Sequence, residues 1–179
     1  MKTREVLRNK QGHQDVLMGT EASENMIKSR NLTQYRYLHF AVHGILRNDV
    51  PYLRAPALVL AYDPSSKEDG FLTFSEIVEL ELNADLVTLS ACKTGLGVLV
   101  PGEGVIGLSK AFMFAGARSL IVSLWEVSDS STALLMEEFY RLLSQGISKV
   151  EALAKAKVYL RQKGYENPYF WAPFILIGD

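Results

Sequence analysis

The sequence is poor in the residues that build disulfides and metal centres. Its 179 residues include one cysteine and three histidines. A single cysteine excludes an internal disulfide framework and is typical of a reducing compartment. The cysteine and the histidines do not have the spacing of a zinc site. We therefore expect no metal and no other cofactor.

The sequence also lacks long apolar runs and an excess of charge of one sign. Its 19 basic and 20 acidic residues are interspersed and give a net charge of −1. This balance argues against direct contact with nucleic acid or with an acidic membrane surface. No apolar run has the length of a membrane-spanning helix, and no secretory signal opens the sequence. We expect a cytoplasmic protein.

Short apolar runs alternate with helical patterns along the chain, in which 48% of the residues are hydrophobic. Strand-like runs occupy residues 15–19, 35–44, 57–62, 85–90, 118–125 and 174–177. Helical spacing follows most of them, and capping boxes begin at Thr73 and Ser148. This alternation predicts an α/β fold, a three-layer α/β/α sandwich with a mainly parallel sheet of about six strands. We expect one domain over residues 15–179, preceded by a polar extension or linker remnant over residues 1–14.

The cysteine lies at the end of a buried strand. The segment 85–95 begins with branched apolar residues and ends in small and polar residues around Cys92, followed by Gly95 and Gly97. Open α/β sheets bind their ligands at the carboxyl ends of strands, so this position suits a nucleophile. The alternative is a small buried side chain, which is the common role of a free cysteine.

A second strand ends in a histidine beside a glycine. It covers residues 35–44 and reaches His43 and Gly44, with His43 lying 49 positions before Cys92. If the two strands are neighbours, the imidazole can take the thiol proton and the thiolate can attack a carbonyl. Glycine at position 44 lets the backbone approach a substrate closely. His39 is predicted to be a packed or hydrogen-bonded histidine, or alternatively to orient His43.

Several ordered motifs carry a family resemblance. They are HFAVHG, LVTLSACKTG, GEGVIGLSKAFMFAGARSLIVSLWEVSD and NPYFWAPFILIGD, and they extend over most of the chain. With these motifs the sequence resembles a CHAT domain, the caspase-like module often joined to tetratricopeptide repeats and related to caspases, separases and gingipains. Caspases have Q-A-C-x-G around the cysteine. This chain has SACKTG instead, so specificity for aspartate is not supported.

The resemblance implies a cysteine endopeptidase with a catalytic dyad. Cys92 is then the nucleophile and His43 the general base, and the amides of Gly44 and Cys92 form the oxyanion hole. It also implies a protein or peptide substrate and an upstream repeat region in the parent chain as a partner. The alternative is a catalytically silent or gated interaction module of the same fold.

The substrate pocket is less well defined by the sequence. Related enzymes build it partly from the strand after the cysteine strand, which points to Ser123, Trp125 and Asp129. Core packing is the alternative for Trp125, and a helix N-cap is the alternative for Asp129. Glu103 lies in the glycine-rich stretch 95–104, which lacks the G-K-[ST] of a phosphate-binding loop. Acidic residues there, with Asp85, would favour a basic substrate side chain, whereas Trp125 would favour an apolar one.

Overall fold

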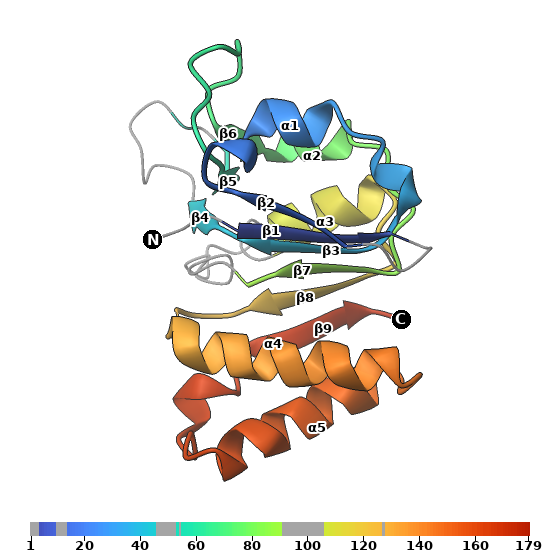
Figure 1. The fold of residues 1–179 in the computed structure, drawn as a ribbon, viewed down its shortest axis with the longest axis vertical. Helices are drawn as coiled ribbons and strands as arrows, with labels where there is room; N and C mark the ends of the chain where they lie inside the picture. The colour runs from blue at the N-terminus through green and yellow to red at the C-terminus, as the bar shows by residue number, and fades with distance from the viewer. Residues whose placement is uncertain (1–3, 10–13, 46–52, 54, 91–105, 127) are drawn as a thin grey trace.

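The protein is described from a computed structural model. The structure describes residues 4–9, 14–45, 53, 55–90, 106–126 and 128–179. Within these ranges the chain has an α/β fold, as the alternation of strand and helix patterns predicted (Figure 1).

The main sheet has six described strands in the order β2-β1-β3-β7-β8-β9. Its central strands β3, β7 and β8 are parallel, whereas the pairs β2/β1, β1/β3 and β8/β9 are antiparallel. The bounds are β1 Arg4–Asn9, β2 Gln14–Met18, β3 Tyr35–Ala41, β7 Leu86–Leu89, β8 Ser119–Ser123 and β9 Phe174–Gly178. All the described residues of β7 and β8 are buried, as expected for strands covered on both faces.

The expectation of a mainly parallel sheet is wrong, because the sheet is mixed. Two helices in succession, α4 (Asp129–Ser144) and α5 (Lys149–Gln162), join β8 to β9. The pair carries the chain along the sheet and back, so β9 starts beside the end of β8 and runs in the opposite direction. β9 is an edge strand, because it pairs with β8 alone among the described strands.

Residues 4–9 correct a second expectation. They form β1 inside the sheet, paired with β2 on one side and β3 on the other, and are not part of a free polar extension. Backbone hydrogen bonds to two neighbouring strands hold this segment. The sequence pattern gave no sign of them because the segment has no regular apolar alternation.

A second, smaller sheet follows β3 directly. It contains β4 (His43–Ile45), β5 (Ala57–Val59) and β6 (Phe71–Thr73), which pair antiparallel in chain order. The chain bends at the buried residue Val42, between β3 and β4. The candidate histidine therefore belongs to the small sheet, although it follows a strand of the large one.

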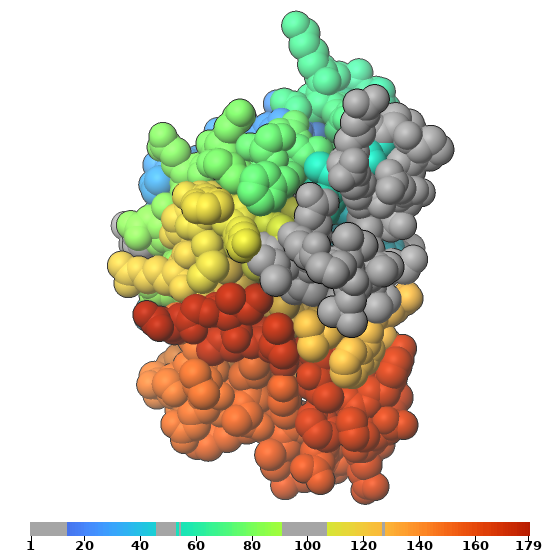
Figure 2. Space-filling model, turned by 180° about the vertical axis from the view of Figure 1, so that it is seen from behind, coloured from blue at the N-terminus to red at the C-terminus, as the bar shows by residue number. Residues whose placement is uncertain are grey.

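Helices lie on both sides of the six-stranded sheet (Figure 1). On one side are α1 (Glu24–Lys28), α2 (Phe74–Val78) and α3 (Ile106–Phe114), and on the other are α4 and α5. Figure 2 shows the molecule from behind, where α2 (green), α3 (yellow) and β9 (red) follow one another down the surface above the orange residues of α4 and α5. Each side has its own hydrophobic core, centred on Phe40 and Phe112 in one and on Phe139 and Phe174 in the other. Three short 3-10 turns complete the described elements at Gly19–Glu21, Leu32–Gln34 and Pro168–Phe170.

The helix starts were largely predictable from local chemistry. The Thr73 amide and hydroxyl both donate to the Glu76 carboxylate, and the Ser148 hydroxyl accepts from the Glu151 amide. The N-cap of α4 differs from the expectation. Ser128 occupies it and accepts from the Ser131 amide, so Asp129 lies one residue inside the helix. Within the described residues, no helix combines the length and the apolar composition needed to cross a bilayer.

Gly116 gives a test of this packing. It ends α3 with a φ of +113°, and a Cβ at this position would lie 2.3 Å from the Leu82 carbonyl oxygen. We expect Gly116→Ala to lower the free energy of unfolding by about 3 kcal/mol, from backbone strain and forced repacking together. Gly146 is the matched control, because its φ is +81° but no atom lies within 4 Å of an added Cβ. Gly146→Ala should cost only roughly 1–2 kcal/mol. Urea unfolding of both variants measures the difference, and equal losses would contradict the packing argument.

Candidate active site

The strands that lead to the two candidate catalytic residues are parallel neighbours. In β3 and β7, Phe40 pairs with Leu89, 49 residues later, and the same offset holds for all four pairs. The Ser90 amide donates to the Phe40 carbonyl at 3.2 Å, so the pairing extends one residue beyond β7. Because the strands are parallel, their carboxyl ends lie next to each other, which is where open α/β sheets bind their ligands.

His43 and Gly44 have different exposures. His43 is the first residue of β4, pairs with Val59 and is exposed to solvent. Gly44 is buried and pairs with Leu58. The imidazole of His43 is therefore accessible at the sheet edge, and the glycine backbone beside it is fixed within the small sheet.

His39 in β3 packs against Tyr140 of α4. Its ring centroid is 5.7 Å from that of Tyr140, and its Nε2 atom is 2.7 Å from the Ser90 hydroxyl. The Tyr140 hydroxyl lies 2.8 Å from the Thr88 hydroxyl. Burial raises the pKa of Tyr140, although the hydrogen bond with Thr88 acts against this. The interpretation of His39 as a packed, hydrogen-bonded histidine is confirmed.

Ser123 is the last residue of β8 and Trp125 lies two residues beyond it, and their polar groups bond within the chain. The buried Ser123 hydroxyl donates to the Trp125 carbonyl at 2.5 Å. The half-buried Trp125 donates its indole N–H to the Tyr169 carbonyl at 2.9 Å. This contact joins the end of β8 to the turn before β9. A role of either residue in a substrate pocket stays a prediction.

The two described acidic residues considered for a basic substrate side chain, Asp85 and Asp129, do not lie together. Asp129 is exposed in the first turn of α4. Asp85 precedes β7 at the opposite edge of the sheet, where its carboxylate lies 2.6 Å from Arg36 and 3.3 Å from Arg118. The suggestion that Asp85 contributes to the site is therefore wrong.

The cysteine half of the site lies outside the described residues. These residues include neither Cys92 nor Glu103, which belong to the segment 91–105. The pairing of Cys92 with His43, the oxyanion hole at Gly44 and Cys92, and the contribution of Glu103 stay predictions.

A pocket of about 880 Å³ lies at the edge of the sheet opposite the candidate site. Its charged residues contact one another, since Arg36 and Arg118 flank the Asp85 carboxylate and the Lys149 ammonium donates to the Asp85 backbone carbonyl at 3.1 Å. Burial lowers the pKa of Lys149, and nearby Asp85 opposes this effect. Apart from Asp85, none of the predicted site residues that the structure describes lines this pocket.

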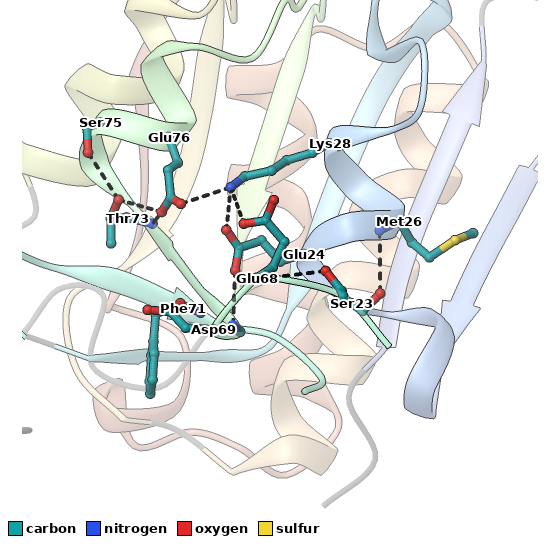
Figure 3. Close-up of polar contacts among 12 residues, drawn as sticks. Ser23, Glu24, Met26, Lys28, Glu68, Asp69, Phe71, Thr73, Ser75 and Glu76 are labelled. Atoms are coloured by element: carbon teal, nitrogen blue, oxygen red, sulfur yellow. Dashed lines mark hydrogen bonds and ion pairs between the residues drawn. The ribbon is translucent and has the colours of Figure 1, made fainter. Parts of the chain in front are cut away.

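The sequence analysis missed a partly buried charge cluster beside the small sheet, in which only Glu24 is fully buried. The carboxylates of Glu24, Glu68 and Glu76 point toward the Lys28 ammonium, as Figure 3 shows. The nitrogen lies 2.5, 2.7 and 2.8 Å from oxygens of these three residues, respectively. Three carboxylate oxygens within 4.8 Å of one another are a potential cation site. Because the Lys28 ammonium already contacts all three, we assign no metal to them.

The only signal for this cluster in the sequence was the capping box at Thr73 and Glu76. Glu24 and Lys28 have the i,i+4 spacing of a helical ion pair, but that spacing occurs on many exposed helices. Glu68 belongs to a loop identified only by its Asp, Pro, Ser and Gly residues. Nothing local to these segments indicates that they meet.

Comparison with known proteins agrees with the motifs described above. The CHAT domain family model matches residues 3–179, a range that includes β1. Tetratricopeptide repeat protein 28 of Homo sapiens is 29% identical over 193 residues, and tetratricopeptide repeat protein 28 of Mus musculus is 28% identical over 193 residues. Each alignment covers 91% of this chain but only 8% of the relative's length. Since the family match covers nearly the whole sequence, the chain belongs to the CHAT domain family.

Proposed function

We propose that this domain is a caspase-like cysteine endopeptidase in which Cys92 is the nucleophile and His43 the general base. The observation that carries the proposal is the register of the parallel strands. Paired residues of β3 and β7 are 49 positions apart, and so are His43 and Cys92. This register brings the ends of β3 and β7 together at Phe40 and Leu89, three residues before His43 and Cys92 respectively, and the chain then turns at Val42 into β4, which begins with His43. The exposed imidazole of His43 is accessible to a substrate at that edge.

The chemistry needs no group beyond these side chains, the backbone and water. His43 takes the proton of the Cys92 thiol, and the thiolate attacks the carbonyl carbon of a peptide bond. The amides of Gly44 and Cys92 donate to the resulting oxyanion. His43 then gives its proton to the leaving amine as the C–N bond breaks. Water, deprotonated by His43, hydrolyses the thioester and restores the thiol.

We propose a three-layer, caspase-like arrangement as the scaffold for this chemistry. Helices on both sides of the six-stranded sheet and two separate hydrophobic cores support it. The parallel strands β3, β7 and β8 would then bring His43, Cys92 and Trp125 to one edge, because parallel strands end on the same side.

The substrate would be a protein segment held in extended form beside this edge. Trp125 supports such contact, because its indole N–H is bonded to Tyr169 and its ring is only half-buried. The exposed carboxylate of Asp129 favours a basic residue near the cut. We place Ser123 and Glu103 at the same pocket. The Ser123 hydroxyl is bonded to the Trp125 carbonyl, so Ser123 would act there by holding the backbone at Trp125.

The domain is also proposed to act as the effector part of a larger regulatory protein. Its relatives are named for tetratricopeptide repeats, and the chain matches only 8% of their length. A repeat region in the parent chain would then control access to the site. These names refer to repeats and not to catalysis, which favours one second candidate: a silent or gated interaction module of the same fold.

Cleavage profiling of the parent protein tests the endopeptidase directly. With a peptide library as substrate, we expect Cys92→Ala and His43→Ala each to lower kcat/KM by at least about 100-fold, since each removes a group that acts in the reaction. His13→Ala removes a histidine with no assigned role and is the matched control. Equal turnover by the wild type and Cys92→Ala would exclude the nucleophile assignment and favour the silent module. The same profile tests Asp129, because Asp129→Asn should weaken any preference for lysine or arginine at the cut site.

The reactivity of the thiol gives a second, substrate-free test. Cys92 is the only cysteine in the sequence, so alkylation by iodoacetamide measures its thiolate directly. We expect the alkylation rate of the wild type to rise with pH, and the midpoint of this rise to lie below the ordinary thiol pKa of about 8.5. In His43→Ala this midpoint should return toward that value. An unchanged midpoint in the variant would mean that His43 does not activate the thiol.

A further inference from the structure

The small sheet connects the backbone of His43 to a point far from it in the sequence. Phe71 at the start of β6 pairs with Val59 in β5, and Val59 pairs with His43 at the start of β4. The three residues form one row across the sheet. Since β4 contains only three residues, its position depends on β5 and β6.

A buried carboxyl group fixes the end of this row. The amide of Gly70, the residue before Phe71, donates to Oε2 of Glu24 at 3.0 Å. Glu24 belongs to α1 and is only 1% exposed. Gly70 has a φ of +85°, and its carbonyl accepts from the Leu60 amide at 2.8 Å, which closes the β5–β6 connection. The Glu24 carboxyl therefore acts on the residue next to the row that contains His43.

A second contact joins the start of α1 to the same connection. The Ala61 amide donates to the Ala22 carbonyl at 2.8 Å, and Ser23 and Ala61 form a parallel bridge. Thus α1 is bound to the β5–β6 connection by backbone pairing as well as by the Glu24 side chain. The backbone contacts hold the connection in place, and the side chain fixes where β6 begins.

The Glu24 carboxyl is surrounded by charged groups from three segments. Lys28 belongs to its own helix, Glu68 to the β5–β6 loop and Glu76 to α2. One oxygen from each of the three carboxyl groups lies within 4.8 Å of the others. Lys28 is the only cation that contacts them among the described residues. The cluster therefore has three acidic groups for one ammonium (Figure 3).

We propose that Glu24 is a positioning residue for His43. Glu24 holds the first residues of β6 and, through the pairing of Phe71 with Val59 and of Val59 with His43, the start of β4. For its effect on catalysis this inference rests on the proposed function. The effect on the position of β4 is independent of the proposed function. The protonation state of Glu24 sets the balance between two effects: an ionised carboxylate accepts more strongly from the Gly70 amide, but it is repelled by the carboxylates of Glu68 and Glu76.

The charges around Glu24 give this contact a pH dependence. Burial raises the pKa of Glu24 to about 7; Lys28 opposes the shift, and hydrogen bonding to Glu76 and Glu68 adds to it. Burial acts to raise the pKa of Glu76 as well, but hydrogen bonds from Lys28 and Thr73 prevail and lower it to about 2. Hydrogen bonding to Lys28 lowers the pKa of Glu68. Of the three carboxyl groups, Glu24 is therefore the one that binds a proton below about pH 7.

The sign of the effect follows from proton binding. The folded-state pKa of Glu24 lies above its ordinary value of 4.5, so between about pH 4.5 and 7 the folded state binds more protons than the unfolded state. The free energy of unfolding then falls as the pH rises through this window. Above it, three carboxylates repel one another around one ammonium, and the loop that contains Glu68 is pushed away from α1. The start of β6 loosens with it.

Hydrogen exchange of the 179-residue chain, followed by NMR, tests the structural half of the proposal. We expect the protection factors of amides in β4 and β6 to fall about tenfold from pH 6 to pH 8, relative to those in β7 and β8. Glu24→Gln keeps an acceptor for the Gly70 amide but cannot ionise, so its protection should not change with pH. Glu21→Gln, at an exposed carboxylate just before α1, is the matched control and should behave as the wild type. A fall of the same size in Glu24→Gln, or no fall in the wild type, would overturn the proposal.

Kinetics of the parent protein test the catalytic half. Glu24→Ala removes the acceptor for Gly70 and should lower kcat about tenfold or more with little change in KM, as a misplaced general base would. Glu24→Gln should restore kcat and should retain it above pH 7, where the wild type declines. If turnover requires Cys92 but both variants match the wild type at every pH, Glu24 does not position His43. If no turnover requires Cys92, the proposed function fails, and the exchange result alone decides the structural proposal.

Discussion

Backbone pairing between β3 and β7 is the interaction on which the rest of the structure depends. These two strands lie in the middle of the six-stranded sheet, and both helical layers pack against this central region. Every residue of β7 is buried, so its amides and carbonyls must be satisfied within the sheet. The only polar side chain of this strand, Thr88, contacts the Tyr140 hydroxyl of α4. A shift of one residue in this register would bring apolar side chains to the wrong face.

The two ends of the central parallel strands carry different side chains. At the edge where β3, β7 and β8 begin, Arg36 and Arg118 contact Asp85, so the charges are paired with one another. At the other edge, where these strands end, His43 is exposed and the Trp125 ring is half-buried. The pocket of about 880 Å³ lies where these strands begin, whereas the exposed His43 lies beyond the end of β3. The candidate site is therefore identified by the side chains that lie there and not by the volume of a pocket.

The small sheet gives the candidate histidine a support of its own. Because β4 leaves the main sheet at Val42, the large hydrophobic core does not fix His43 directly. Its backbone depends on β5 and β6, and these depend on α1 through the Glu24 carboxyl and the Ala22–Ala61 contact. Buried ion pairs are costly to form, so such a cluster is more easily understood as a device that specifies a position than as a source of stability.

The sequence alone determined the elements whose signals are local. Apolar runs located β3, β7 and β8, and the spacing of Ser148 and Glu151 located the start of α5, because side-chain period and capping involve residues a few positions apart. The motifs around His43 and Cys92 likewise indicated the family before any fold was known. The tertiary structure alone decided that residues 4–9 form an inner strand, that β9 runs antiparallel, and that Glu24, Glu68 and Glu76 meet around Lys28. These features depend on hydrogen bonds and ion pairs between segments that are distant in the chain. A local sequence pattern does not show which distant groups will pair with one another.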